Sequence, residues 1–226
     1  MTRSSWLFAG AFLLLAGCKP AAEPTAPASA PASPATSTTP AQLDAAAPAT
    51  ATAPQTATPS FDCTKSPGEF EQMVCNDPVL AALDRQLADT FAQALAKASD
   101  KATLQASERG WIKGRDECGK ADDKPACVRE AYIERIVDLR IQQGLVVIPS
   151  AVEYRCDDNS KPFTATFYND EPRAVVLTWG NDQAIVPAAV SASGARYAAD
   201  GVAFWEHQGE ARVDFYGNKL VCKPAK

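Results

Sequence analysis

The middle of the chain has apolar residues at the spacing of an amphipathic helix. Asn76-Asp77-Pro78 supplies an N-cap and a first-turn proline, so a helix is predicted to begin there. Its apolar residues follow at steps of three and four, which places them on one face of the helix. They are Leu80, Leu83, Leu87, Phe91 and Leu95.

The same periodicity predicts two further helices. The second runs from about residue 102 to 118, and the third from about 125 to 143. The residues expected to face inward are Leu104, Trp111 and Ile112 in the second helix, and Val128, Tyr132, Ile136 and Leu139 in the third. The first two helices, joined near Ser99-Asp100, should form an antiparallel hairpin with the third packed across it.

Four cysteines flank these helices. Cys63 and Cys75 bracket a predicted polar turn, and the hairpin would return Cys118 and Cys127 to the same end of the module. Four cysteines allow three pairings, and the sequence selects none of them.

From about residue 150 the periodicity changes to that of strands. Apolar and polar residues alternate over 163–168. Further strand-like runs lie at 174–179, 183–186, 202–205 and 211–216, with turn residues such as Gly217-Asn218 between them. Many short strands at close spacing predict an antiparallel barrel or sandwich. Cys156 near its start and Cys222 near its end would join the first strand to the last.

The fold class is therefore predicted to be α+β in two separate domains. A disulfide-stapled module of three helices is expected at 61–145, and a small antiparallel β-barrel at 150–226.

The N-terminus reads as an export signal. A basic start and a short apolar run fill 1–17, too short to span a bilayer as a mature helix. The ending Leu-Ala-Gly-Cys resembles the bacterial lipoprotein box, which implies cleavage before Cys18 and acylation of that cysteine. An ordinary cleaved signal with an incidental cysteine is the alternative. Lys19 after the lipidated cysteine implies, by the same resemblance, the outer membrane, with the protein facing the periplasm.

A different composition follows in 18–60, which is rich in proline, alanine and threonine. It offers too little apolar side chain to offset the entropy of ordering, so it is predicted to be a disordered tether. The acyl chains on Cys18 and this tether would hold the folded part near the membrane surface.

Charge and cysteine content narrow the classes of partner. The chain has 22 basic and 27 acidic residues and a net charge of −5. Neither domain is basic, which argues against nucleic acid and suits a cationic partner. With Cys18 acylated, the other six cysteines can form three disulfides. Zinc is the competing interpretation, but the chain has a single histidine and no Cys-x-x-Cys spacing, so no metal or cofactor is expected.

The helical domain resembles a known module. Its segments are CTKSPGEFEQMVCNDPVLAALDRQLADTF, ERGWIKGRDEC and CVREAYIERIVDLR, which are similar to the LprI N-terminal domain of bacterial envelope proteins. Some members are linked to lysozyme inhibition, but no local residue set here explains such an activity. Arg115 and Asp116 could be a contact pair or simply part of a solvated face.

The strand-rich domain resembles the MliC family of membrane-bound inhibitors of c-type lysozyme. The matching segments are YRCDDN, FTATFYND, SASGARY and VAFWEHQGEA, followed by the terminal Cys222. The resemblance implies an antiparallel barrel of about eight strands. It also implies that the Ser-Gly-Ala-x-Tyr loop and the loop after Phe-Trp enter the lysozyme cleft and bind its two catalytic carboxyl groups.

The chemistry of this blockade follows from the residue types. A glycosidase cleft holds a protonated acid near an ionised carboxylate, and a hydroxyl can donate to one and accept from the other. Ser193 offers the hydroxyl, Gly194 and Ala195 would let the backbone approach, and Tyr197 would anchor the end of the loop. The full set of predicted lysozyme-binding residues is Ser193, Gly194, Ala195, Arg196, Tyr197, Trp205 and His207.

His207 departs from the pattern that the resemblance implies. Many family members have a lysine two residues after Phe-Trp, whereas this chain has Glu206-His207. A histidine carries less positive charge than a lysine at neutral pH. If His207 takes the role of the lysine, inhibition should tighten as the pH falls toward about 6.

Three other interpretations stay open. The Ser-Ala-Ser-Gly stretch could be an ordinary permissive turn. Ser193, His207 and Asp200 are the right residue types for a hydrolase triad, although no nucleophile elbow is present and we expect no enzyme activity. The protein could instead be a scaffold that binds another envelope component through its helical domain. The sequence does not set an oligomeric state.

Overall fold

The computed structural model describes residues 58–65 and 68–225. The predicted signal peptide, the lipidation site Cys18 and most of the predicted tether lie outside the described residues. Among the described helices, none is long and apolar enough to cross a membrane.

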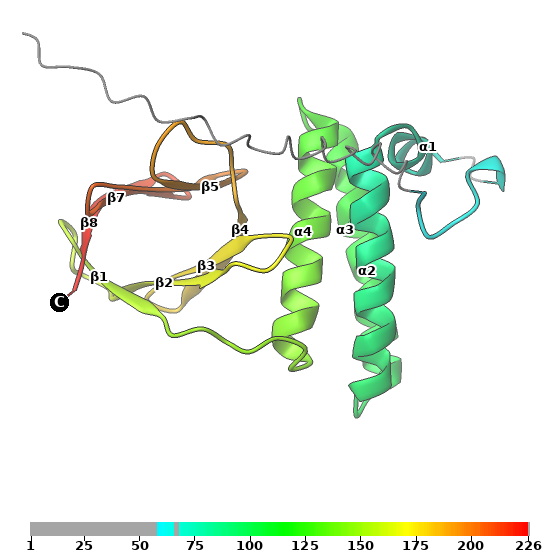
Figure 1. The fold of residues 1–226 in the computed structure, drawn as a ribbon, viewed down its shortest axis with the longest axis horizontal. Coiled ribbons are helices and arrows are strands. Elements are labelled where there is room, and N and C mark those ends of the chain that lie inside the picture. Colours follow the sequence, from blue (N-terminus) through cyan, green and yellow to red (C-terminus); the bar gives the residue numbers. More distant parts are fainter. Residues whose placement is uncertain (1–57, 66–67, 226) are drawn as a thin grey trace, which may run out of the picture. The chain divides into compact units, whose positions relative to one another are not determined.

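The first described part is helical (Figure 1). Its elements are η1 (Cys63–Lys65), α1 (Glu69–Asn76), α2 (Pro78–Lys97), α3 (Lys101–Asp116), η2 (Glu117–Lys120) and α4 (Lys124–Gln142). The three long helices each begin at an aspartate, because its side chain accepts a hydrogen bond from a backbone N–H of the first turn. These N-caps are Asp77, Asp100 and Asp123.

The three predicted helices are present within two residues of their expected ends, and α4 packs against both α2 and α3. Two details were wrong. The segment between Cys63 and Cys75 is not only a polar turn, because α1 forms there and buries Val74 completely. Ile112 does not face inward; it is 40% exposed, while its neighbour Trp111 packs against the core and takes the inward direction on this turn of α3.

A polar network runs through the helical core. The Tyr132 hydroxyl, which is fully buried, donates to Asp84 Oδ1 at 3.1 Å and accepts from Arg115 Nη1 at 3.2 Å. The Arg115 guanidinium is 8% exposed and lies 5.6 Å from the ring centroid of Trp111. Arg115 is thus neither a contact residue nor part of a solvated face, because its charge is held inside by Asp116 and the surrounding rings.

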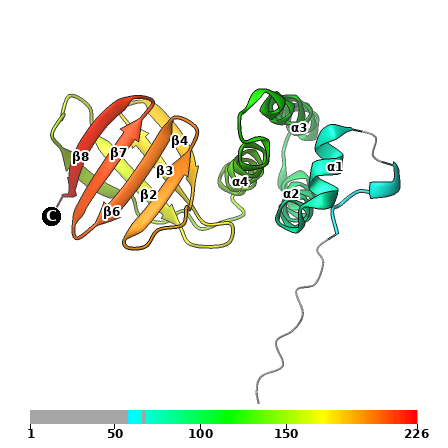
Figure 2. The ribbon, with the colours of Figure 1, turned by 90° about the horizontal axis from the view of Figure 1, so that it is seen from above.

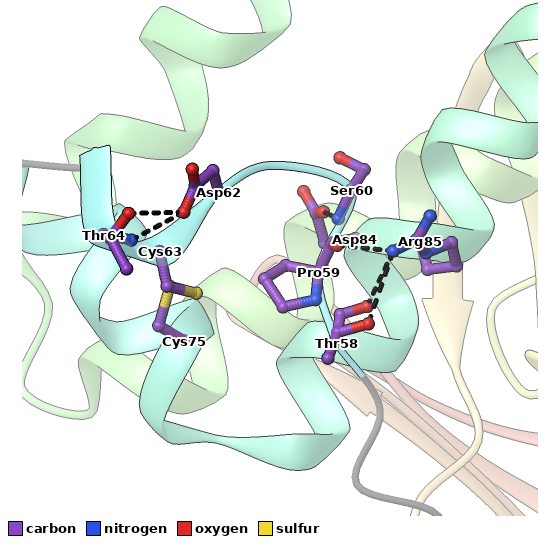
Figure 3. The surroundings of a disulfide bond; sticks show 9 residues. All are labelled: Thr58, Pro59, Ser60, Asp62, Cys63, Thr64, Cys75, Asp84 and Arg85. Atoms are coloured by element: carbon purple, nitrogen blue, oxygen red, sulfur yellow. Dashed lines mark hydrogen bonds between the residues drawn. A yellow bond between two sulfur atoms is a disulfide. The ribbon is translucent and has the colours of Figure 1, made fainter.

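The same network holds the chain where it enters the domain (Figure 3). Ser60 N–H donates to Asp84 Oδ2 at 2.6 Å, and Arg85 Nη2 donates to the carbonyl oxygen of Pro59 at 2.6 Å. Residues 58–60 are therefore fixed along α2. The two helical disulfides are Cys63–Cys75, also drawn in Figure 3, and Cys118–Cys127.

The second part is an eight-stranded antiparallel sheet that curls into a nearly closed barrel (Figure 2). The strands are β1 (Val152–Cys156), β2 (Phe163–Tyr168), β3 (Ala174–Trp179), β4 (Asp182–Pro187), β5 (Ala195–Ala199), β6 (Val202–His207), β7 (Glu210–Phe215) and β8 (Asn218–Pro224). Their order is β4-β3-β2-β1-β8-β7-β6-β5. An isolated bridge between Ala188 and Tyr197 links the β4 end to β5.

Aromatic rings fill the interior of the barrel. Phe204 of β6 is completely buried, and the rings of Tyr154, Phe163, Phe167 and Tyr197 surround it with centroids 5.8 to 6.5 Å away. The disulfide Cys156–Cys222 joins directly paired residues of β1 and β8. The interior is therefore almost wholly apolar, and most of the barrel's charged side chains lie on its outer face.

Candidate functional site

The stretch 191–197 is only partly a loop. The strand β5 begins at Ala195, so the loop proper ends at Gly194. Tyr197 is 8% exposed, packs against Phe167 and Phe204, and burial raises the pKa of its phenol. The structure thus places Tyr197 inside the barrel, where it can hold the loop in position but presents little surface to a partner.

The backbone of Gly194 lies very close to strand β6 of the same barrel. Its φ is +71°, and a Cβ built there would lie 2.1 Å from the carbonyl oxygen of Glu206 and 3.2 Å from His207 Cβ. A side chain has no room at this position, whatever lies outside. Gly194 therefore allows the loop to lie against β6. Its predicted role in the approach of the backbone to a partner stays a prediction.

The main chain of Ser193 is held in place by hydrogen bonds to its carbonyl oxygen. Its carbonyl oxygen accepts a hydrogen bond from Trp205 Nε1 at 3.0 Å and another from Ser191 Oγ at 2.5 Å. Among the described residues, no hydrogen bond of the Ser193 hydroxyl is found, and the side chain is exposed. This arrangement fixes the main chain of an exposed serine while its hydroxyl stays available.

The outer face of the barrel beside this serine presents an aromatic residue between two cations. Trp205 of β6 pairs in register with Arg196 of β5 on one side and Arg212 of β7 on the other. Paired residues of adjacent strands project from the same face of a sheet, so these three side chains form one row. We call Arg196, Trp205 and Arg212 the Arg-Trp-Arg row.

His207 lies at the end of β6. Its ring stacks on that of Trp205, with centroids 5.6 Å apart and an angle of 10° between the planes. It precedes a tight turn in which Gln208 and Gly209 both have positive φ, and it pairs in register with Glu210. Its ring is therefore in contact with the Arg-Trp-Arg row at the edge of the barrel.

A cavity of about 760 Å³ lies against the Arg-Trp-Arg row. The loop residues Ser191 and Ser193 border it, as does Lys219 of β8. His207 and Tyr197 do not line it. Of the predicted site residues, the structure thus brings Ser193, Arg196 and Trp205 together around one cavity, whereas Gly194, Ala195, Tyr197 and His207 do not line it.

The sequence interpretation missed Arg212 and Lys219. Both are exposed and lie on β7 and β8, outside the two loops that the family resemblance singled out. The alternation of 211–216 could have indicated that Arg212 points outward, but which strands flank Trp205 depends on the sheet order.

The hydrolase triad is not assembled. Asp200 lies in the turn between β5 and β6, at the opposite end of β6 from His207. The five residue steps between Val202 and His207 correspond to roughly 17 Å of strand. Asp200 therefore cannot orient His207 toward Ser193, and this interpretation is wrong.

Comparison with known proteins adds the following. Residues 154–221 match the family model of MliC, described as membrane-bound lysozyme-inhibitor of c-type lysozyme. Lipoprotein LprI of Mycobacterium tuberculosis (strain ATCC 25618 / H37Rv) is 43% identical over 169 residues, which cover 74% of this chain and 85% of the relative. Lipoprotein LprI of Mycobacterium bovis has the same identity and coverage.

Among solved structures, Pseudomonas aeruginosa MliC in complex with hen egg white lysozyme is similar to this chain. The sequence identity is 27% and the TM-score 0.29, with 35% of this chain and 92% of that chain covered.

Proposed function

Because the chain belongs to the LprI family of lipoproteins and carries a C-terminal MliC domain, we propose that it is a lipid-anchored inhibitor of c-type lysozyme. It presents the loop ending at Gly194 and the β6 end after Phe204-Trp205 to the catalytic cleft of the enzyme. Cys18 carries the acyl chains, and the protein acts at the outer membrane facing the periplasm.

The exposed hydroxyl of Ser193 on a fixed main chain carries this proposal. A c-type lysozyme is a glycosidase whose cleft holds a general acid and an ionised carboxylate. The Ser193 hydroxyl can donate to the carboxylate and accept from the acid. Because Trp205 and Ser191 already hold the Ser193 carbonyl, the loop loses little conformational entropy when it binds.

The neighbouring residues have supporting roles in this proposal. Gly194 keeps the loop close to β6, Ala195 starts the strand, and Tyr197 anchors that strand in the barrel core. Arg196 and Trp205 border the hollow beside Ser193. A cleft-blocking inhibitor needs no turnover, so this function does not require Asp200 to lie near His207.

The proposal is tested by titrating a c-type lysozyme with the mature lipidated chain in detergent micelles. Ser193→Ala should weaken inhibition by about tenfold, since one hydrogen bond to a charged group contributes roughly 1.5 kcal/mol. Ser160→Ala, at another exposed loop serine of the same barrel, is the matched control and should inhibit like the wild type. The proposal fails if the wild-type chain does not inhibit the enzyme.

A further inference from the structure

Arg212 lines the cavity although it lies outside the two loops that the family resemblance singled out. It lies on β7 directly beside Trp205, across the ladder from β6, and its side chain is exposed. With Arg196 on the other side, it places a second guanidinium along the cavity that Ser193 borders. The cavity therefore extends beyond the two loops onto the strands β7 and β8.

The acids of this cavity are already engaged by the backbone. Asp157 Oδ1 accepts hydrogen bonds from the amides of Val221 at 3.0 Å and of Asp158 at 2.9 Å. Asp214 Oδ1 accepts one from Gly217 N–H at 2.9 Å. These carboxylates are therefore partly satisfied without help from the cations that share the cavity.

The cations are more available than the acids. Within the described part of the chain, neither Arg196 nor Lys219 has a carboxylate within 4.0 Å. Arg212 Nε lies 3.4 Å from Glu210 Oε1, but the arginine side chain is 69% exposed. An exposed pair of this kind contributes little, so Arg212 can exchange Glu210 for another carboxylate at low cost.

His207 is placed less well to act as the cation. It does not line the cavity, and its ring lies flat on the Trp205 indole. Stacking of this kind fixes the orientation of Trp205, whose Nε1–H in turn holds the Ser193 carbonyl. The histidine thus acts on the loop through the tryptophan.

We propose that Arg212, assisted by Lys219, supplies the positive charge that receives the ionised carboxylate of the lysozyme cleft, and that His207 positions Trp205 instead. This inference rests on the proposed function and names the residues of this chain that would bind the lysozyme carboxylate. A guanidinium is suited to the task because it can donate two parallel N–H bonds to one carboxylate. In this proposal, Arg212 rather than His207 takes the role that the resemblance gives to the family's lysine.

The main experiment compares single variants of the lipidated chain in the lysozyme titration. Arg212→Gln should raise the inhibition constant about tenfold and flatten its salt dependence, because a charge-assisted contact is lost. Lys219→Gln should have a smaller effect in the same direction. Arg173→Gln is the matched control, since Arg173 Nε is likewise bonded to the glutamate two residues before it, at 3.1 Å from Glu171, and does not line the cavity.

His207→Gln distinguishes the two assignments. It should raise the inhibition constant about two- to threefold without changing its salt dependence, since a positioning residue carries no charge to the partner. The proposal is overturned if Arg212→Gln behaves like Arg173→Gln while His207→Gln loses both affinity and salt dependence. Unchanged circular dichroism spectra establish that the variants are folded.

A second measurement needs no enzyme. The indole N–H signal of Trp205 in a nitrogen-15 NMR spectrum is followed while citrate, a small tricarboxylate, is added. The signal should shift and saturate in the wild type and in Arg173→Gln, and the shift should be absent in Arg212→Gln. If the wild type inhibits no lysozyme but the citrate response holds, the proposed function fails while the carboxylate site stands; a wild type without any citrate response contradicts the site.

Discussion

The helical part and the barrel both contain disulfides, but the disulfides close very different lengths of chain. In the helical part, Cys63–Cys75 and Cys118–Cys127 join residues 12 and 9 positions apart. In the barrel, Cys156–Cys222 spans 66 positions and ties the first strand to the last. The helical disulfides therefore secure local turns, whereas the barrel disulfide secures the closure of the whole domain.

Their interiors differ as well. The helical core contains a buried charge, Arg115, and a tyrosine hydroxyl that links it to Asp84. The barrel core is built from aromatic rings around Phe204. The helical part uses its polar interior to hold the incoming chain at Ser60, and the barrel leaves its charged residues outside, where the Arg-Trp-Arg row can meet a partner.

Removing the disulfides should show the largest difference between the two parts. In the chain-entropy description, loss of Cys156–Cys222 costs about 4 kcal/mol of unfolding free energy, and loss of Cys118–Cys127 about 3 kcal/mol. The double alanine variants of each pair are unfolded in urea. Far-UV circular dichroism reports mainly the helices, and near-UV circular dichroism reports mainly the barrel, which holds Trp179 and Trp205, with a contribution from Trp111 of the helical core. Equal losses in both variants, or a barrel that is insensitive to Cys156 and Cys222, would contradict the comparison.

Glu134 of α4 makes the stability of the folded chain sensitive to pH. It lines a cavity of about 540 Å³, and burial, reinforced by the negative charge of Glu130, raises the pKa of its carboxyl from 4.5 to about 7. The arginines of the same cavity, Arg115 and Arg135, are ion-paired with other carboxylates. The folded protein therefore holds this proton more tightly than the unfolded chain does.

The sign of the effect follows from this difference. The contribution of Glu134 to stability is fully present below about pH 4.5 and is lost as the pH rises through about 7. Glu134→Gln should therefore be more stable than the wild type by about 3 kcal/mol near pH 8 and equally stable near pH 4. Urea midpoints measured across this range test it, with the exposed Glu153→Gln as a control that should follow the wild type at every pH.

Deleting one hydroxyl from each core compares the two interiors directly. The Tyr132 hydroxyl makes two buried hydrogen bonds, with Asp84 and Arg115, whereas the Tyr154 hydroxyl donates one, to Glu206 Oε2 at 3.0 Å. Tyr132→Phe should cost about 2 kcal/mol and Tyr154→Phe about 1 kcal/mol, since each unpaired buried group adds its desolvation cost. A larger loss for Tyr154→Phe in urea unfolding would show that the polar network does not stabilise the helical core.

The helix positions could be predicted because their signals are local. An aspartate cap, a first-turn proline and a three-to-four spacing lie within a few residues of one another, and α2 begins at Pro78 as expected. The pairing of the four helical cysteines could not be predicted, because it depends on where α1 places Cys75. The sequence signal for α1 is weak, since the helix buries only one residue, Val74. The burial of Arg115 was missed for the same reason: its partners come from other helices.

The candidate site likewise contains residues that the sequence indicates and residues that only the fold brings together. The family resemblance drew attention to Ser193 and Trp205, and the structure brings both to one cavity. Tyr197 and Gly194 lie in the quoted motif, yet their environments are set by long-range contacts with Phe204 and Glu206. Arg212 belongs to a different segment of the sequence and becomes a neighbour of Trp205 only through strand pairing.

Gly194 links the stability of the barrel to the geometry of the candidate site. Gly194→Ala and Gly217→Ala both place a side chain at positive φ, +71° and +85°, which costs about 1 kcal/mol in each case. Only at Gly194 does the new Cβ meet a backbone atom, the carbonyl oxygen of Glu206; nothing lies within 4 Å at Gly217. Because the atom met is part of the backbone, the loop must shift away from β6 and lose the bond from Trp205 Nε1 to the Ser193 carbonyl. Gly194→Ala should therefore unfold at a lower urea concentration than Gly217→Ala.

Inhibition should separate the two glycine variants. Movement of the loop in Gly194→Ala would break the bond from Trp205 Nε1 to the Ser193 carbonyl, so the hydroxyl would no longer be held beside the Arg-Trp-Arg row. We expect its inhibition constant to rise by about tenfold or more, whereas Gly217→Ala should inhibit like the wild type. Equal inhibition by both variants would mean that the loop binds without being fixed to β6, and that the barrel contributes a surface but not the position of its serine.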